Sequence, residues 1–459
     1  MNLPQSLHFV GIGGVGMSAV AQVCHAKGVR VSGSDAQMSA TVQRLQSLGI
    51  TVHIGHAAEN VGPDARALVV STAVSTENPE VAEALRRGLP IHHRSAVLGR
   101  LMAAKSSVAV TGTHGKTTTT AMLSAILLAA DLDPTVLLGG DLPALGGNAR
   151  HGEGPWLVAE ADESDKSLVN LTAKLVIVTN LEGDHLEHYK NLDEIIEVVA
   201  SFIRALPAGS LVVGCLDDAG VRDLRDRVSV PFVTYGTSSD ADFPIKQVRL
   251  SSEGSTFEVA GVPYALKVGG HHNVLNATAA IVASLKMGIT PIPMQRALVA
   301  FGGVKRRFQT IGTVGGVTVV DDYAHHPSEV KATLSAAALL GRPIHAVFQP
   351  HRHSRLEALL KEFSDSFGGS RSVTILNTYG AGEAPRKVDA GSLTDLVREA
   401  MPGVPVAHTP SHQAAVEHLA GQANPGDLVL LLGAGDIHLV AQPLLSRLED
   451  RFDPAARTA

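Results

Sequence analysis

A glycine loop that carries a lysine is the feature of this sequence best suited to chemistry. The apolar run VAV leads into Gly112, Thr113, His114, Gly115, Lys116, Thr117 and Thr118, and a long segment with an apolar face follows. Such loops cradle phosphates with backbone N–H groups, while the lysine supplies charge and the threonine hydroxyl ligates magnesium. A chance Gly-Lys-Thr at a helix start is the alternative, which the order of strand, turn and helix disfavours. We expect ATP and Mg²⁺ to bind here.

A second glycine loop stands near the start of the chain. The run HFV precedes Gly11-Ile12-Gly13-Gly14-Val15-Gly16, and Asp35 closes the next apolar run. This pattern is typical of a loop that binds the diphosphate of a nucleotide, and any diphosphate-bearing nucleotide would satisfy it. A loop that serves only the fold is the alternative. A dehydrogenase needs no ATP loop and a simple ATPase needs no second nucleotide domain, so we expect the second nucleotide to be the handle of a substrate.

Carboxylates follow two apolar runs downstream of the lysine loop. The run WLV leads into Glu160, Asp162, Glu163 and Asp165, and the run LVIVTN leads into Glu182, Asp184 and His185. The ends of parallel strands meet at one sheet edge, and oxygen ligands suit Mg²⁺. A solvated acidic loop is the alternative, which the neighbouring phosphate loop disfavours. These residues are therefore candidate metal ligands.

Alternating short apolar runs and helical stretches must position these residues, and they predict α/β units with parallel sheets. At roughly 150 residues per domain, the 459 residues suggest about three domains. We expect a Rossmann-like domain over 1–104, a central α/β domain of the P-loop ATPase type over 105–311, and a Rossmann-like α/β domain over 312–459. The stretch FGGVKRRF is the predicted hinge, and alternation over 242–268 predicts an antiparallel hairpin region.

Composition excludes several classes of partner and setting. The 38 basic and 44 acidic residues give a net charge of −6 without a basic stripe, so we expect no nucleic acid to bind. Cys24 and Cys215 are too few for a disulfide framework, which favours a reducing cytoplasm. The start lacks the features of a signal peptide, and the apolar runs are shorter than the ~18 residues that span a bilayer. We expect no membrane insertion.

Motifs along nearly the whole chain resemble the Mur ligases. In order, they are Gly112 to Thr117, Glu160 to Ser164, Thr179-Asn180 with Asp184-His185, His272-Asn273 with Asn276, Arg306-Arg307-Phe308, and Asp321 to Pro327. Within that family, HFVGIGGVGMSAVA, EADESD, DDYAHHP and QPHRHSR resemble the branch that adds the first amino acid of the peptidoglycan stem. The resemblance implies that ATP phosphorylates the lactyl carboxylate of UDP-N-acetylmuramate and that the amine of L-alanine then attacks the acyl phosphate.

The resemblance also implies a role for each matching residue. Lys116, Glu160, His185 and Arg307 are the expected catalytic residues, with Thr117, Glu160 and His185 as metal ligands. The ATP site would comprise residues 112–118 together with Asn273, Asn276, Arg307 and Asp322. The UDP-substrate site would comprise Gly11, Gly13, Gly14, Gly16, Met17, Asp35 and Ser71. The third domain would hold the L-alanine carboxylate with His351, Arg352 and Arg355, because guanidinium groups bind carboxylates in bidentate fashion.

Three other functions stay open at this point. A recycling ligase that attaches a whole tripeptide to the same nucleotide sugar would share the ATP site and the handle. An NAD-binding regulator would use the ATP loop as a switch, and a silent scaffold would use neither loop. The joint presence of Lys116, Glu160 and His185 disfavours the scaffold. We expect a monomer or a weak homodimer.

Overall fold

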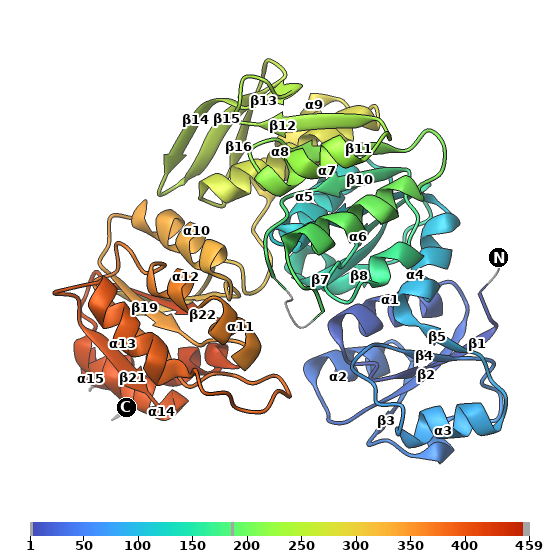
Figure 1. Cartoon of the computed structure of the whole chain (residues 1–459), viewed down its shortest axis with the longest axis horizontal. Helices are drawn as coiled ribbons and strands as arrows, with labels where there is room; N and C mark the ends of the chain where they lie inside the picture. Colours follow the sequence, from blue (N-terminus) through green and yellow to red (C-terminus); the bar gives the residue numbers. More distant parts are fainter. Residues whose placement is uncertain (1–2, 185–187, 453–459) are drawn as a thin grey trace, which may run out of the picture.

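The computed structural model describes residues 3–184 and 188–452, and three α/β units follow one another along the chain (Figure 1). The N-terminal unit is a parallel sheet in the order β3-β2-β1-β4-β5. Its strands are β1 (Ser6–Val10), β2 (Arg30–Asp35), β3 (Thr51–Ile54), β4 (Leu68–Val70) and β5 (Ile91–His93). Its helices are α1 (Val15–Ala26), α2 (Ala40–Ser47), η1 (Ala58–Asn60), α3 (Pro79–Arg86) and α4 (Arg94–Ala103). The nucleotide loop expected from the sequence joins β1 to α1.

The central unit is a larger sheet in the order β13-β12-β11-β10-β6-β9-β7-β8, in which only the β7–β8 pair is antiparallel. Its strands are β6 (Ser106–Thr111), β7 (Thr135–Leu142), β8 (Gly147–Arg150), β9 (Trp156–Glu160), β10 (Leu175–Val178), β11 (Leu211–Cys215), β12 (Phe232–Gly236) and β13 (Phe243–Pro244). Its helices are α5 (Lys116–Ala129), α6 (Leu192–Arg204), α7 (Ala219–Arg227), α8 (His271–Lys286) and α9 (Pro291–Ala300), with η2 (Pro143–Leu145) and η3 (Ser167–Asn170).

A small antiparallel sheet extends the central unit. It consists of β14 (Lys246–Ser251), β15 (Gly254–Val259) and β16 (Val262–Leu266) in sequence order. Phe257, Tyr264 and Leu266 are buried and pack on the same core as α8 and α9. The antiparallel hairpin region predicted from the alternating sequence is confirmed.

The third unit is a sheet in the order β17-β18-β22-β19-β20-β21, parallel except for the β17–β18 hairpin. Its strands are β17 (Gln309–Val314), β18 (Val317–Asp322), β19 (Ile344–Phe348), β20 (Ser372–Leu376), β21 (Val406–Thr409) and β22 (Leu428–Leu432). Its helices are α10 (Pro327–Ala338), α11 (His353–Ala358), α12 (Leu360–Ser364), α13 (Ala390–Ala400), α14 (His412–Gln422), η4 (Ile437–Val440) and α15 (Ala441–Phe452). β17 begins before the expected boundary at residue 312, so the third sheet takes in part of the chain assigned to the central domain.

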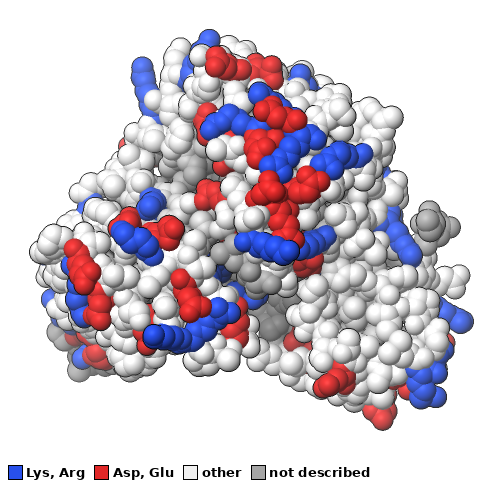
Figure 2. Space-filling view, viewed as in Figure 1, with Lys and Arg blue, Asp and Glu red and all other residues white. Residues whose placement is uncertain are grey.

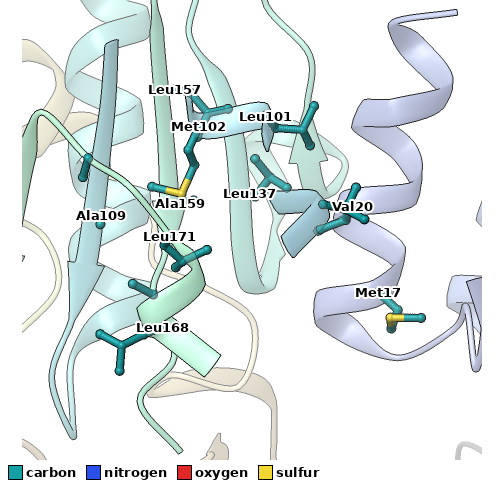
Figure 3. Packing of buried hydrophobic residues seen from close by; sticks show 14 of the residues in the cluster. Met17, Val20, Leu101, Met102, Ala109, Leu137, Leu157, Ala159, Leu168 and Leu171 are labelled. Atoms are coloured by element: carbon teal, nitrogen blue, oxygen red, sulfur yellow. The ribbon is translucent and has the colours of Figure 1, made fainter. Parts of the chain in front are cut away.

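The N-terminal and central units share one hydrophobic core. Met17 and Val20 of α1 lie in the same buried cluster as Leu137 of β7 and Leu157 of β9, with Leu101 of α4 between the units (Figure 3). Among the described residues, the two buried clusters of the third unit contain residues from that unit alone. β22 is buried along its whole length, as expected for a central strand of a sheet covered on both faces. Hydrophobic packing therefore joins the first two units more closely than it joins either to the third.

Acidic and basic side chains are interleaved on the face shown in Figure 2. Around α6 and α7, Arg227 pairs with Asp193 and Asp223, and Arg204 pairs with Glu197. Among the helices described, none is long and apolar enough to span a bilayer.

Candidate active site

The lysine loop bends where β6 ends and α5 begins, and its geometry matches the sequence expectation. Gly115 has φ of 81° at the N-cap of α5, a conformation that favours glycine. Lys116 Nζ donates to the Gly112 carbonyl at 2.6 Å and to both Glu163 carboxylate oxygens at 3.0 and 3.1 Å. Burial opposes the charge of Lys116, but the Glu163 carboxylate raises its pKa. The lysine thus stays cationic at the edge of the sheet where phosphates would bind.

The candidate metal ligands that the structure describes lie side by side. The Thr117 hydroxyl donates to Glu160 Oε2 at 3.2 Å, and the Gly139 N–H donates to Glu160 Oε1. Burial raises the pKa of the Glu160 carboxyl, so a cation beside it would favour the ionised form. A hydroxyl and a carboxylate are the oxygen ligands that suit Mg²⁺. His185, the third expected ligand, lies outside the described residues.

A cavity of about 610 Å³ opens at the junction of the three units. Its wall brings together Lys116, Thr117 and Glu160 from the central unit and Arg94 from α4. The hinge contributes Arg307, and the third unit contributes Tyr323, His325, His351, Arg352 and Arg355. Residues that are far apart in sequence and carry the expected phosphate, metal and carboxylate chemistry therefore face one space.

The three residues expected to clamp L-alanine line this cavity but already have protein partners. Arg355 forms a bidentate pair with Asp184, Nε to Oδ1 at 2.8 Å, and both side chains are buried. Arg352 is 3.4 Å from the Glu383 carboxylate. The His351 ring stacks on Tyr379, and its pKa is lowered to about 3, chiefly by burial. The neutral imidazole and the guanidinium groups form a polar wall of the cavity that Lys116 and Thr117 also line.

A larger cavity of about 970 Å³ lies between the central and third units. It contains most of the expected ATP residues, namely His114, Gly115, Thr118, Asn273, Asn276, Arg307 and Asp322. Asn276 accepts from the Thr119 hydroxyl at 3.3 Å, and its amide lies where a Cβ on Gly115 would clash. Gly112 lines neither cavity, because the Thr179 side chain packs against it.

Asp322 lines this larger cavity and also has a structural role. Its carboxylate accepts from the N–H groups of Phe308 at 2.7 Å and Ala324 at 2.8 Å. It therefore holds the predicted hinge against the third sheet. Arg307, on that same hinge, lies over the Tyr323 ring and pairs with Glu329 at 3.3 Å.

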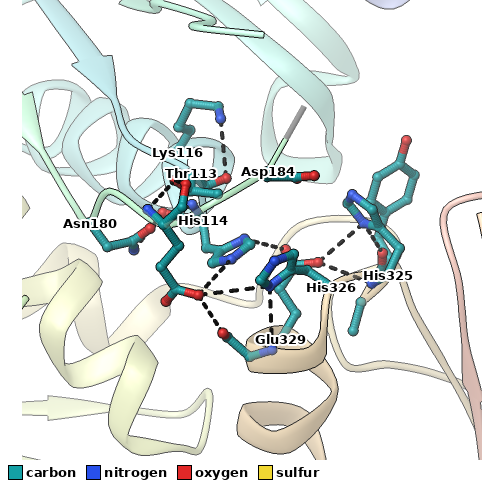
Figure 4. Close-up of polar contacts among 12 residues, drawn as sticks. Thr113, His114, Lys116, Asn180, Asp184, His325, His326 and Glu329 are labelled. Carbon is teal, nitrogen blue, oxygen red and sulfur yellow. Dashed lines mark hydrogen bonds and ion pairs between the residues drawn. The ribbon is translucent and has the colours of Figure 1, made fainter. Parts of the chain in front are cut away.

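A histidine and carboxylate cluster joins the lysine loop to α10 (Figure 4). His114 Nδ1 is 3.4 Å from Glu329, and His114 Nε2 is 3.7 Å from Glu182. Burial opposes protonation of His114, but the charges of Glu329 and Glu182 raise its pKa to about 9. The ring of His326 lies 4.7 Å away, and burial together with the charge on His114 lowers its pKa to about 4. His114 therefore carries the positive charge of the pair near neutral pH, while the His326 ring stays neutral.

Three carboxylates shape this site in ways that sequence analysis did not predict: Glu163 and Glu182 were only candidate metal ligands, and Glu329 was assigned no role. Glu163 and Glu182 belong to acidic motifs that were recognised, but their pairing with Lys116 and His114 depends on the fold. Glu329 had one local signal, because it lies in the first turn of a helix that Pro327 begins.

The N-terminal glycine loop borders a separate cavity of about 570 Å³. Gly11, Gly13, Gly14, Met17, Asp35 and Ser71, all expected from the sequence, line it. Asp35 accepts from the Gly13 N–H at 2.8 Å, which orders the loop. Gly16 faces the junction cavity instead, and the Arg94 guanidinium occupies the space where its Cβ would be.

Comparison with known proteins shows that the three units match the domains of one protein family. Residues 6–106 match the Mur ligase family catalytic domain, 110–284 the Mur ligase middle domain, and 306–435 the Mur ligase glutamate ligase domain. The chain is 44% identical to a UDP-N-acetylmuramate--L-alanine ligase of Desulforamulus reducens, over 97% of this chain and 98% of that one. It is 43% identical to the protein of the same name from Acidobacterium capsulatum, over 98% of each chain.

Two solved structures resemble the whole chain. The UDP-N-acetylmuramate-alanine ligase of Thermotoga maritima has a TM-score of 0.82 at 30% identity, covering 97% of this chain and 99% of its own. A murein peptide ligase of Psychrobacter arcticus has a TM-score of 0.72 at 25% identity, covering 96% and 98%. Since the three family models match successive parts of the chain and the relatives align over nearly their full length, the chain belongs to the Mur ligase family.

Proposed function

We propose that this protein is an ATP-dependent ligase that joins L-alanine to the lactyl carboxylate of UDP-N-acetylmuramate. The observation that carries the proposal is the junction cavity, where Lys116, Thr117 and Glu160 face Arg307, Arg352 and Arg355. Relatives that bear the name of this activity align over nearly the full chain, which supports it over the tripeptide ligase. The reaction has no hydride step, so we infer that the N-terminal cavity takes UDP rather than NAD.

The first step forms an acyl phosphate. A lactyl carboxylate oxygen attacks the γ-phosphorus of ATP, the bond to the β,γ-bridging oxygen breaks, and ADP leaves. Lys116 and Arg307 are the cations beside the transferring group, and phosphoryl transfer depends on such positioning and charge more than on a protein nucleophile. Thr117 and Glu160, with His185, would hold Mg²⁺, which neutralises phosphate charge when it is bound.

The second step forms the amide. The neutral amine of L-alanine attacks the acyl carbon, phosphate leaves with the electron pair of the carbon–oxygen bond, and the nitrogen loses a proton. We infer that His351, Arg352 and Arg355 hold the L-alanine carboxylate and leave its amine free to attack. Docking of the third unit would exclude water from the acyl phosphate, which water would otherwise hydrolyse.

The substrates also support a setting. ATP and a nucleotide sugar are cytoplasmic metabolites, and the two cysteines are free and buried. We infer a cytoplasmic enzyme that acts as a monomer or a weak homodimer.

Phosphate release with ATP and UDP-N-acetylmuramate, measured against each amino acid in turn, tests the proposal. We expect release with L-alanine above all other amino acids and none without the nucleotide sugar. Release that depends on the tripeptide instead would identify the recycling ligase. Tight NAD binding that displaces UDP-N-acetylmuramate, without release of phosphate, would identify the regulator.

A further inference from the structure

A buried carboxylate lies beneath the N-terminal cavity, and the proposed reaction does not use it. Glu80 has no exposed surface, although it lies in the first turn of α3. Its Oε2 accepts from His8 Nε2 at 3.1 Å and from the Ser34 hydroxyl at 2.7 Å. Its Oε1 accepts from His56 Nδ1 at 3.2 Å and from the Asn60 amide at 3.0 Å. Four side chains, from β1, from β2 and from the stretch between β3 and the end of η1, thus donate to one carboxylate.

Glu80 is held in its ionised form. Burial raises its pKa, but the hydrogen bonds from His8, Ser34 and Asn60 outweigh burial and lower the pKa to about 2. The Asn78 side chain, at the N-cap of α3, also accepts from the Glu80 N–H at 2.9 Å, and a helix N-terminus favours a negative charge. A buried charge with this many partners is costly to build, so its position calls for a reason beyond packing.

That reason is the link from Glu80 to the cavity. Of its four partners, His56 lines the 570 Å³ cavity together with Asp35 and Ser71, and 28% of its side chain is exposed. An ionised carboxylate accepts only, and the Ser34 hydroxyl, 3.1 Å from His56 Nδ1, already gives its hydrogen to Glu80, so Nδ1 must carry the hydrogen. In the neutral ring, Nε2 then carries the lone pair and is the nitrogen left for a ligand.

We propose that Glu80 is a positioning residue for the nucleotide sugar, which fixes the ring and the tautomer of His56 so that Nε2 accepts a hydrogen bond from an N–H or O–H of the bound nucleotide. This inference rests on the proposed function, because it takes the N-terminal cavity as the UDP site. Without the carboxylate, the His56 ring can rotate or carry its hydrogen on Nε2. The nucleotide N–H or O–H would then face another donor, and the hydrogen bond would be lost.

The test compares wild type with Glu80→Gln, His56→Gln and the double variant. We expect the dissociation constant for UDP, measured by calorimetry, to rise about tenfold in Glu80→Gln, with the KM for UDP-N-acetylmuramate rising in parallel. The kcat and the KM for ATP should stay within about twofold of wild type, since neither Glu80 nor His56 lines the junction cavity or the 970 Å³ cavity. The double variant should bind UDP no more weakly than His56→Gln alone, because Glu80 acts through His56.

His8→Gln is the matched control. His8 donates to the same carboxylate but does not line the cavity, so the change should lower the melting temperature and leave UDP binding unchanged. If Glu80→Gln does not fold, Glu80→Asp keeps the charge but withdraws it from Nδ1, and the same weakening of UDP binding is expected. Two results would overturn the proposal. One is that Glu80→Gln leaves UDP binding unchanged, and the other is that it weakens UDP binding as much in the His56→Gln protein as in wild type.

Asp35→Ala and Ser71→Ala separate this proposal from the one it rests on. If both bind UDP as wild type does, the cavity is not the nucleotide site and the proposed function is wrong at this point. If either weakens UDP binding while Glu80→Gln does not, only the role of Glu80 is wrong.

Discussion

Lys116 is expected to act both in catalysis and in stabilising the fold. Two substitutions, made singly and together, separate these roles. Lys116→Ala should nearly abolish phosphate release, because it removes the cation beside the transferring phosphoryl group. Preorganised charges of this kind stabilise a transition state by on the order of several kcal/mol. It should also lower the melting temperature, since the buried Glu163 carboxylate loses its Lys116 partner. Adding Glu163→Gln should restore the melting temperature but not the activity. Turnover within a few-fold of wild type in Lys116→Ala would refute the catalytic role.

Arg355 tests the amino-acid end of the site. Arg355→Ala should raise the KM for L-alanine far more than that for ATP, because losing a charge-assisted hydrogen bond costs roughly 1.5–3 kcal/mol. Arg386→Ala is the control, as Arg386 is an exposed arginine of the same unit that pairs with Glu357. If Arg352→Ala and Arg355→Ala both keep the wild-type dependence on L-alanine concentration, the carboxylate is held elsewhere.

Two elements, the lysine loop and α10, are held together by the protonated His114. Its pKa in the folded protein, about 9, lies above the ordinary value of 6.5. Its ion pairs with Glu329 and Glu182 therefore contribute fully below pH 6.5, and the contribution is lost as the pH rises through 9. The unfolding free energy of wild type relative to His114→Gln should fall over that range. In Glu329→Gln the fall should shrink, and a difference that is flat from pH 6 to 10 would contradict the pairing.

The sequence predicted the helices, strands and loops better than the contacts between them. The strands, both glycine loops and the acidic strand ends were predicted, because each depends on local periodicity and on residue types within a few positions. The pairs Glu80–His8 and Arg355–Asp184 were not, since their partners are 72 and 171 residues apart and no local pattern joins them. Nor did the sequence separate Gly16 from the other loop glycines, because that depends on where Arg94 of α4 projects.

At the scale of the whole molecule, the three units are held together in two different ways. The first two share a hydrophobic core, and Asn148 of β8 adds bonds to α1, donating to the Val15 carbonyl at 2.8 Å. The third unit meets the central unit through ion pairs such as Arg355–Asp184 and His114–Glu329. Water cannot replace the contacts that apolar side chains lose when a hydrophobic core opens, whereas it can solvate the charged groups of a broken ion pair. We therefore expect the third unit to move relative to the other two.

Limited proteolysis tests that expectation at two lysines. Lys305 lies in the hinge with 54% of its side chain exposed, whereas Lys105, between the first two units, binds the Gly152 and Gly154 carbonyls with its ammonium group. Endoproteinase Lys-C, which cuts after lysine but not after the adjacent Arg306 and Arg307, should therefore cut first after Lys305 and release the N-terminal and central units as one fragment. ATP, Mg²⁺ and UDP-N-acetylmuramate should slow this cut by favouring the docked third unit, and Lys305→Gln should delay it without ligands. A first cut at Lys105, or a hinge cut that substrates do not slow, would mean that the moving joint lies elsewhere.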